Sequence, residues 1–234
     1  MKFMFKKGCF FVGLLLSITQ FSCSHLPDTF EPVESFSITE TQKYIEIDNG
    51  QQATTGIIFY PGGLVDAHAY LPLFSNTLMA NLSVKSVLVK MPLNLAVFDA
   101  NEAQHVIETY PEIERWFIAG HSLGGAMACT AVNNSPSLFN GMILMAAYPA
   151  NSVDLSNWAG KVLSLRGSND LLTEQKDIDN TKDQLPNNTE YTTIDGGNHA
   201  GFGQYGVQSK DGENELSNPS QIDITVEKII NFIL

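Results

Sequence analysis

The sequence has few cysteines, few basic residues and no long apolar run. Three cysteines in 234 residues are too few for the disulfide framework that stabilises small exported domains. Thirteen lysines and arginines against 25 acidic residues give a formal net charge of −12. Such a surface repels nucleic-acid phosphates and anionic membranes. We therefore expect no nucleic-acid partner, and we expect a packed apolar core, for which the 44% hydrophobic content is sufficient.

The N-terminus has the pattern of an export signal. Three lysines in the first seven residues precede an apolar stretch at about residues 8–18, which is shorter than the roughly 20 residues of a membrane span. A basic start, a short apolar middle and small residues at the exit are typical of a signal peptide. The pattern predicts an export signal over residues 1–22, whose removal would take three lysines and lower the formal net charge from −12 to −15.

Residues 22–24, SCS, resemble a bacterial lipoprotein cleavage site, where the cysteine becomes the lipidated first residue. Gln20 and Phe21 differ from the residues that usually precede such a cysteine. We expect a lipid anchor on Cys23 at the bacterial cell envelope, a tether over residues 23–35 and one domain over residues 36–234. The alternatives are an uncleaved signal anchor, or a secreted or periplasmic form in which Cys23 is an ordinary residue.

The domain alternates short apolar runs with segments of helical pattern. Continuous apolar runs rich in β-branched and aromatic residues are typical of parallel strands buried on both faces. Such strands are predicted at 56–60, 86–90, 116–119, 142–146, 162–166 and 191–194, after shorter β pieces at 36–39 and 43–47. Helices are predicted at 67–82, 98–109, 123–134, 172–184 and 220–232. The alternation predicts a three-layer α/β sandwich with a mostly parallel sheet, whose ligands bind at the carboxyl ends of the strands.

Residues 120–124, GHSLG, supply the candidate nucleophile, Ser122. A serine hydroxyl needs a base and an exposed position to act as a nucleophile. The G-x-S-x-G motif provides that position on a sharp turn between a strand and a helix, where flanking glycines avoid clashes. The bare motif arises easily by chance, but here an apolar run precedes it and a helix of small residues follows it. That context favours a functional turn.

The candidate base is His199, in a glycine-rich loop after the last predicted strand. The candidate acid is Asp170, just past the strand at 162–166, because triads on this kind of turn follow the chain order Ser, Asp, His. A carboxylate there would hold the imidazole in the correct tautomer. Two alternatives stay open: Asp170 could cap the helix at 172–184, and Asp195, on the histidine's own loop, is the second candidate acid.

Two backbone amides are expected to bind a developing oxyanion. One is the amide of Leu123, at the N-terminus of the helix that follows Ser122. The other should come from residues 60–64, YPGGL, after the first parallel strand, where glycines let the backbone approach a substrate. Gly63 is the preferred donor and Leu64 the alternative, and Leu64 is also a candidate substrate contact. No cofactor or metal is expected.

At this point the chain resembles a known family, the bacterial α/β-hydrolases of the dienelactone-hydrolase-like group. The resemblance covers about residues 56–210. The motifs that carry it are YPGGLVDAHAY at 60–70, KMPLNLAVF at 90–98, GHSLGG at 120–125, GSND at 167–170 and GGNHAGFGQYG at 196–206. The resemblance implies the α/β-hydrolase fold and a triad of Ser122, Asp170 and His199. The dienelactone hydrolases themselves use a cysteine nucleophile, whereas this chain has serine.

The spacing leaves no room for a lid domain, since only 48 positions separate Ser122 from Asp170. An open site would suit a small or exposed ester substrate, cleaved through an acyl-enzyme intermediate. A thioesterase, amidase or acyltransferase could use the same triad. A binding protein that keeps the fold without catalysis is a further alternative. The sequence leaves the oligomeric state open.

Overall fold

The computed structural model describes residues 37–79 and 83–234. The expected export signal, Cys23 and the tether lie outside these residues, so those expectations stay predictions. Within the described ranges no helix is both long and apolar enough to cross a membrane.

Eight strands form one sheet in the order β1-β2-β4-β3-β5-β6-β7-β8. Their bounds are β1 (Ser37–Glu40), β2 (Tyr44–Asp48), β3 (Thr55–Tyr60), β4 (Val84–Val89), β5 (Arg115–His121), β6 (Gly141–Met145), β7 (Lys161–Gly167) and β8 (Glu190–Ile194). The β1–β2 and β2–β4 pairs are antiparallel, and from β4 to β8 all pairs are parallel. The predicted mostly parallel sheet is confirmed.

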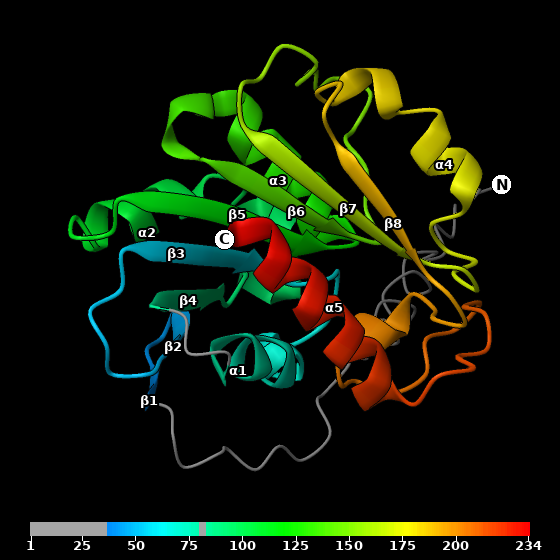
Figure 1. Ribbon diagram of the computed structural model, residues 1–234, viewed down its shortest axis with the longest axis horizontal. Coiled ribbons are helices and arrows are strands. Elements are labelled where there is room, and N and C mark those ends of the chain that lie inside the picture. Colours follow the sequence, from blue (N-terminus) through cyan, green and yellow to red (C-terminus); the bar gives the residue numbers. More distant parts are fainter. Residues whose placement is uncertain (1–36, 80–82) are drawn as a thin grey trace, which may run out of the picture.

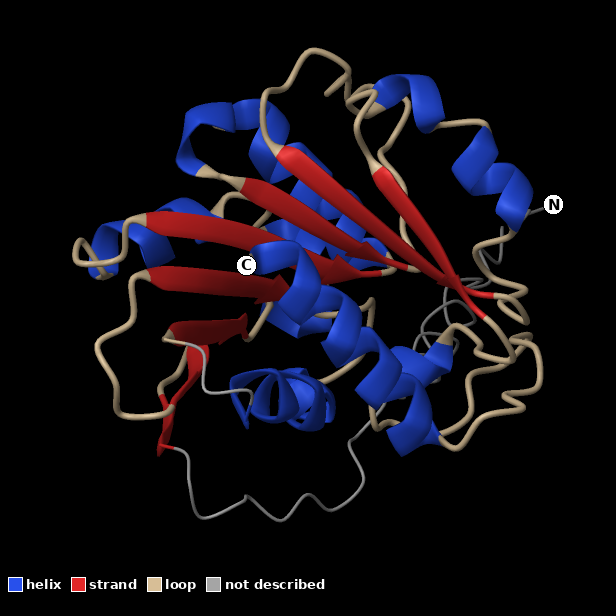
Figure 2. Ribbon diagram, in the orientation of Figure 1, coloured by secondary structure: helices blue, strands red, loops and turns tan. Residues whose placement is uncertain are grey.

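Helices cover both faces of the sheet, which gives the three predicted layers (Figures 1 and 2). The helices are α1 (Leu71–Met79), α2 (Glu102–Thr109), α3 (Leu123–Asn134), α4 (Gln175–Asp179) and α5 (Asn218–Ile233). Helix α5 crosses one face and packs against α1. Helix α3 lies behind the sheet in Figure 1 and packs on β5. The three-layer α/β-hydrolase sandwich is thus the observed fold.

Side chains of the parallel strands alternate between two apolar cores. In β3, Ile57 and Phe59 join the core under α1 and α5, whereas Ile58 and Tyr60 join the core under α2 and α3. All four are fully buried. Burial of successive residues on opposite faces explains why these strands are continuous apolar runs in the sequence.

Two of the predicted helices are shorter in the structure. The helix predicted at 172–184 is reduced to α4 and a 3₁₀ turn, Lys182–Gln184, because the Asp170 carboxylate binds the amides of Leu172 and Thr173 in a tight turn. The helix predicted at 98–109 begins at Glu102, because Asp99 has non-helical backbone angles. The segment predicted as helix 67–82 begins with a 3₁₀ turn and continues as α1, and residues 80–82 lie outside the described part.

The strand connections place two loops at one crevice. The loop after β3 leads to α1 on one face, and the loop after the adjacent strand β5 leads to α3 on the other face. Neighbouring strands whose connections leave to opposite faces open a crevice at their carboxyl ends. Ser122 and the YPGGL loop lie on the two sides of this crevice.

Candidate active site

Ser122 lies on a sharp turn between β5 and α3, with φ 52° and ψ −122°. These angles are strained for a residue with a side chain. The Ser122 amide donates to the Met145 carbonyl at the end of β6 (2.9 Å), and the Ser122 carbonyl accepts the first helical bond, from Ala126 (3.1 Å). The turn is therefore held at both ends, and its side chain is partly exposed.

The glycines of the motif allow this turn to pack tightly. A Cβ atom on Gly120 would lie 2.5 Å from the backbone of Gly124. A Cβ atom on Gly124 would lie 2.1 Å from the Tyr60 carbonyl oxygen and 2.3 Å from that of Pro61. The close approach of Gly124 brings the YPGGL loop against the start of α3.

Replacing Gly124 with alanine should lower the free energy of unfolding by about 3 kcal/mol, because backbone atoms in direct contact with the new methyl must move. Gly63→Ala is the matched control, since its Cβ would meet no backbone atom closely and its nearest neighbour would be the movable end of the Leu123 side chain, at 3.1 Å. Its expected cost is below about 1 kcal/mol. Urea unfolding measures both; equal midpoints for wild type and Gly124→Ala would contradict the packing described.

His199 and Asp170 meet in the interior beside the carboxyl ends of β7 and β8. His199 Nδ1 lies 3.0 Å from Asp170 Oδ2, and both side chains are buried. The other carboxylate oxygen of Asp170 accepts from the amides of Leu172 (2.8 Å) and Thr173 (2.7 Å). Asp170 thus holds a turn and faces the imidazole at the same time. Asp195, the alternative acid, is exposed.

Asp211 holds the His199 loop, and no sequence motif predicts this role. Its carboxylate accepts from the amides of His199 (3.2 Å) and Ala200 (2.8 Å). Asp211 lies in an irregular segment before α5, and no motif surrounds it in the sequence. The anchoring fixes the backbone that carries the candidate base.

His121 connects the candidate base to the turn that carries Ser122. Its ring lies 4.7 Å from the His199 ring, centroid to centroid, and its Nε2 lies 3.1 Å from the His199 carbonyl oxygen. His199 is therefore packed against the residue that precedes Ser122. The Ser122 hydroxyl makes no hydrogen bond within the described residues, and bonds of this kind often tighten only when substrate is bound.

In the YPGGL loop Gly63 has the amide that can donate to a ligand, because the residues on either side of it have no free N–H. Pro61 has no N–H, and the Gly62 amide donates to the Tyr70 hydroxyl (3.1 Å). The Leu64 amide donates to the Asn94 carbonyl (2.7 Å), so the alternative that Leu64 donates to an oxyanion is wrong. Gly63 lies next to the side chain of Leu123, the other preferred donor: a Cβ on Gly63 would be 3.1 Å from Leu123 Cδ2.

An exposed apolar surface adjoins these two amides, and we call it the apolar rim: Leu64, Leu93, Val97 and Phe98. Their side chains are 39, 79, 49 and 59% exposed, respectively. The bond from Leu64 to Asn94 joins the two segments of the rim, and the 3₁₀ turn Ala96–Phe98 packs against α3. Leu64, Leu93 and Asn94 all have φ near +60°, a strained backbone of the kind that clusters at binding sites.

No lid covers the site in the described part of the chain. The segment between β6 and β7 is fixed to the body of the domain. Gln184 Nε2 donates to the carbonyls of Ala150 and Val153, and Val153 and Leu155 are buried in the core under α3.

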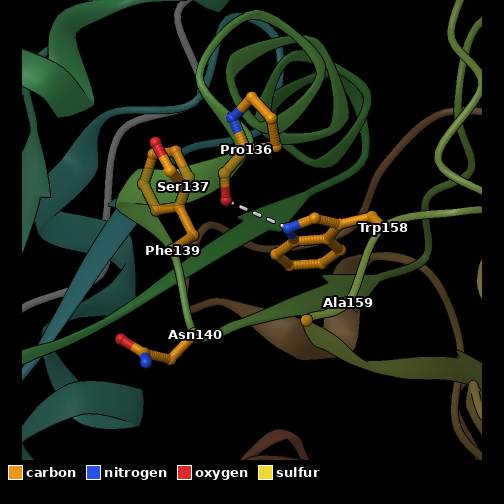
Figure 3. Close-up of a pocket in the computed structure, with 7 residues that line it drawn as sticks. Pro136, Ser137, Phe139, Asn140, Trp158 and Ala159 are labelled. Carbon is orange, nitrogen blue, oxygen red and sulfur yellow. Dashed lines mark hydrogen bonds between the residues drawn. The ribbon is translucent and has the colours of Figure 1, made fainter.

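A surface pocket of about 440 Å³ lies elsewhere, between residues 136–140 and 158–160 (Figure 3). The Trp158 indole donates to the Pro136 carbonyl at its mouth (3.0 Å). These loops precede β6 and β7, so the pocket is at the amino ends of the strands, opposite Ser122. It is lined by no titratable side chain, and it takes no part in the site.

The family model described as "Alpha/beta hydrolase family" matches residues 56–223. This chain belongs to the alpha/beta hydrolase family. The match covers both loops of the crevice, Ser122, Asp170 and His199. A comparison with curated protein sequences finds no match.

Solved structures of other alpha/beta hydrolases share the fold. A predicted CIB-like hydrolase from Thermoplasma acidophilum has a TM-score of 0.62 at 15% identity, covering 84% of this chain and 99% of its own. Est1E from Butyrivibrio proteoclasticus, solved with ferulic acid bound, has a TM-score of 0.62 at 12% identity, covering 86 and 95%. Carboxylesterase CesB from Bacillus subtilis has a TM-score of 0.59 at 12% identity, covering 86 and 92%. At such identities the likeness shows the fold of this alpha/beta hydrolase.

Proposed function

We propose that this alpha/beta hydrolase is a serine carboxylester hydrolase similar to the dienelactone-hydrolase-like group, with Ser122 as its nucleophile. One observation carries the proposal. The strained turn that presents Ser122 is followed by Leu123, whose side chain lies next to Gly63, and it is preceded by His121, which packs against the buried His199–Asp170 pair. Cys129, a potential nucleophile in α3, is fully buried, and burial raises the pKa of its thiol, so the serine is the better candidate.

The reaction follows from this arrangement. Ser122 Oγ attacks the ester carbonyl while His199 Nε2 takes the hydroxyl proton. The carbonyl oxygen becomes an anion that binds the amides of Gly63 and Leu123. The C–O bond to the alcohol then breaks, and His199 returns the proton to the departing oxygen. Water, deprotonated by His199, attacks the acyl-enzyme. The bond between the acyl carbon and Ser122 Oγ then breaks, the acid leaves, and His199 returns the proton to Ser122 Oγ. Asp170 holds the imidazole with its Nδ1 proton toward the carboxylate and stabilises the imidazolium.

The acyl or alcohol group of the substrate should be apolar. The apolar rim continues directly from Gly63 through Leu64, and no lid encloses it, so an apolar group can lie along the surface beside the oxyanion amides. A panel of nitrophenyl esters of graded acyl length, with matched thioesters and amides, tests the proposal. We expect oxygen esters to react fastest. Faster turnover of thioesters or amides would show that the protein is a thioesterase or an amidase instead. Ligand binding without any turnover would show that it is a binding protein.

Replacing Leu93 with aspartate should raise KM for an octanoate ester about 10-fold, because an apolar contact worth about 1.4 kcal/mol is lost. KM for the acetate ester should change less than about twofold, since a short acyl group does not reach the rim. Leu234→Asp is the control: Leu234 is also exposed (77%), but it lies at the C-terminus beyond α5. Equal effects of Leu93→Asp on both esters would contradict a role for the rim.

We also propose that the protein is exported and anchored at the cell envelope through a lipid on Cys23. The basic start, the short apolar stretch and the SCS sequence support this proposal. Mass spectrometry of the N-terminus of protein expressed in a bacterium tests it. A chain beginning at a diacylated Cys23 is expected, whereas an unmodified chain that retains residues 1–22 would contradict it.

A further inference from the structure

A chain of buried hydrogen bonds runs beneath Ser122 from one side of the site to the other. The Gly62 amide lies 3.1 Å from the Tyr70 hydroxyl oxygen. That oxygen lies 2.8 Å from His121 Nδ1. His121 Nε2 lies 3.1 Å from the His199 carbonyl oxygen. We call this chain the Tyr70–His121 relay. Both side chains are buried, and neither takes part in the reaction above.

The two ends of the relay fix the direction of the outer bonds. A backbone amide only donates, so the Tyr70 oxygen accepts from Gly62. A backbone carbonyl only accepts, so His121 Nε2 carries the proton that goes to His199. Burial, reinforced by the nearby His199, holds the pKa of His121 well below its usual range and favours the neutral ring. A neutral His121 with its proton on Nε2 has a lone pair on Nδ1, which accepts the proton of the Tyr70 hydroxyl.

The relay ends next to the atoms that react. Gly62 precedes Gly63, the oxyanion donor. His199 is the base itself, held through its own carbonyl. His121 precedes Ser122. The rings of Phe202 and Tyr205 pack against His121 at 5.6 and 6.3 Å between centroids, so His121 has little freedom to move.

We infer that Tyr70 and His121 are positioning residues that hold the oxyanion loop, the Ser122 turn and the His199 loop in one fixed arrangement. The inference rests on the proposed hydrolase function. Reactions of this kind need reacting groups within a fraction of an ångström of the productive geometry. A single tyrosine hydroxyl connects two loops from opposite sides of the site, so its removal should disturb both at once.

Tyr70→Phe removes that hydroxyl and keeps the ring. We expect kcat for ester hydrolysis to fall about 10- to 100-fold while KM changes less than about threefold, because the loss affects alignment and leaves the rim intact. Tyr60→Phe is the matched control. The Tyr60 hydroxyl is also buried and also makes two hydrogen bonds, in its case with the Ala103 amide (2.8 Å) and the Ala100 carbonyl (2.9 Å), but neither bond leads to the reacting residues.

Both variants should lose similar thermal stability, and only Tyr70→Phe should lose kcat. Wild-type kcat in Tyr70→Phe would overturn the inference, and so would an equal loss of kcat in Tyr60→Phe. A wild type that neither hydrolyses esters nor reacts with a fluorophosphonate would instead overturn the hydrolase proposal. The two failures are thus distinguishable.

Substitutions of His121 test its bond to Tyr70 and its bond to the His199 loop one at a time. Asparagine places an amide oxygen near the position of Nδ1 and can accept from Tyr70, whereas glutamine places an amide nitrogen near Nε2 and can donate to His199. Both should have lower kcat than wild type, with Gln the more active because it keeps the bond to the base. Nitrogen-15 spectra of the wild-type imidazoles at pH 7.5 test the tautomer without activity. A proton on Nδ1 of His121 would overturn the inference.

Discussion

Replacing Ser122 with alanine should lower kcat for ester hydrolysis by about 10⁵- to 10⁶-fold. The variant keeps the oxyanion amides of Gly63 and Leu123 and the His199–Asp170 pair, so a small residual rate above that of water should remain. Steady-state kinetics on the best ester of the panel measures the loss. A decrease of less than about tenfold would mean that another group attacks the substrate.

The same position offers an internal control for folding. Ser122→Gly also removes the hydroxyl, but it places glycine at φ 52° and ψ −122°, where glycine is not strained. Its free energy of unfolding should exceed that of Ser122→Ala by about 1 kcal/mol. A variant that is inactive and more stable separates loss of chemistry from loss of fold. Equal stabilities of the two variants would contradict the strain at Ser122.

Replacing Asp170 with asparagine should lower kcat about 10⁴-fold. The asparagine oxygen can still accept from the amides of Leu172 and Thr173, so the turn stays folded. Its NH₂ group, however, would face His199 Nδ1. The imidazole would then accept at Nδ1 and carry its proton on Nε2, where it could no longer take the proton of Ser122. The pH dependence and kcat of the variant, measured on the same ester, report this change.

Asp195→Asn is the matched control for this experiment. Asp195 lies on the same loop as His199, but its side chain is exposed. We expect kcat of Asp195→Asn to stay within about twofold of wild type, as is usual for an exposed position. A large loss in Asp195→Asn together with a small one in Asp170→Asn would show that the wrong carboxylate was assigned.

The sequence was sufficient to predict the order of strands and helices and the strand ends after which the candidate site residues lie. Parallel strands buried on both faces must be apolar throughout, and that pattern located β3 to β7 within one or two residues. The chain order of Ser122, Asp170 and His199 identified residues that the fold brings to one edge of the sheet. The starts of two helices were predicted less well. The bonds of the Asp170 carboxylate to Leu172 and Thr173 form a turn where a helix was predicted, and the non-helical backbone of Asp99 delays the start of α2.

The details of the site depend on contacts between distant segments, which a single sequence does not reveal. Leu64 could not be excluded as an oxyanion donor without the bond from its amide to Asn94, 30 positions along the chain. Asp211 belongs to no motif, and the motif that ends at Tyr70 assigns that residue no role. Both reach the site only because the segment before α5 and the 3₁₀ turn Ala67–Tyr70 fold against it. His121 is part of the GHSLG motif, but its bonds to Tyr70 and to the His199 loop follow only from the structure.

The central claim is that Ser122 is a nucleophile activated by His199. Covalent labelling of the folded protein with a fluorophosphonate, followed by mass spectrometry of its peptides, tests this claim most directly. We predict one adduct per chain, located on Ser122, which forms in wild type and is lost in His199→Ala. A folded wild-type protein that stays unlabelled, or that carries the adduct on another residue, would contradict the claim.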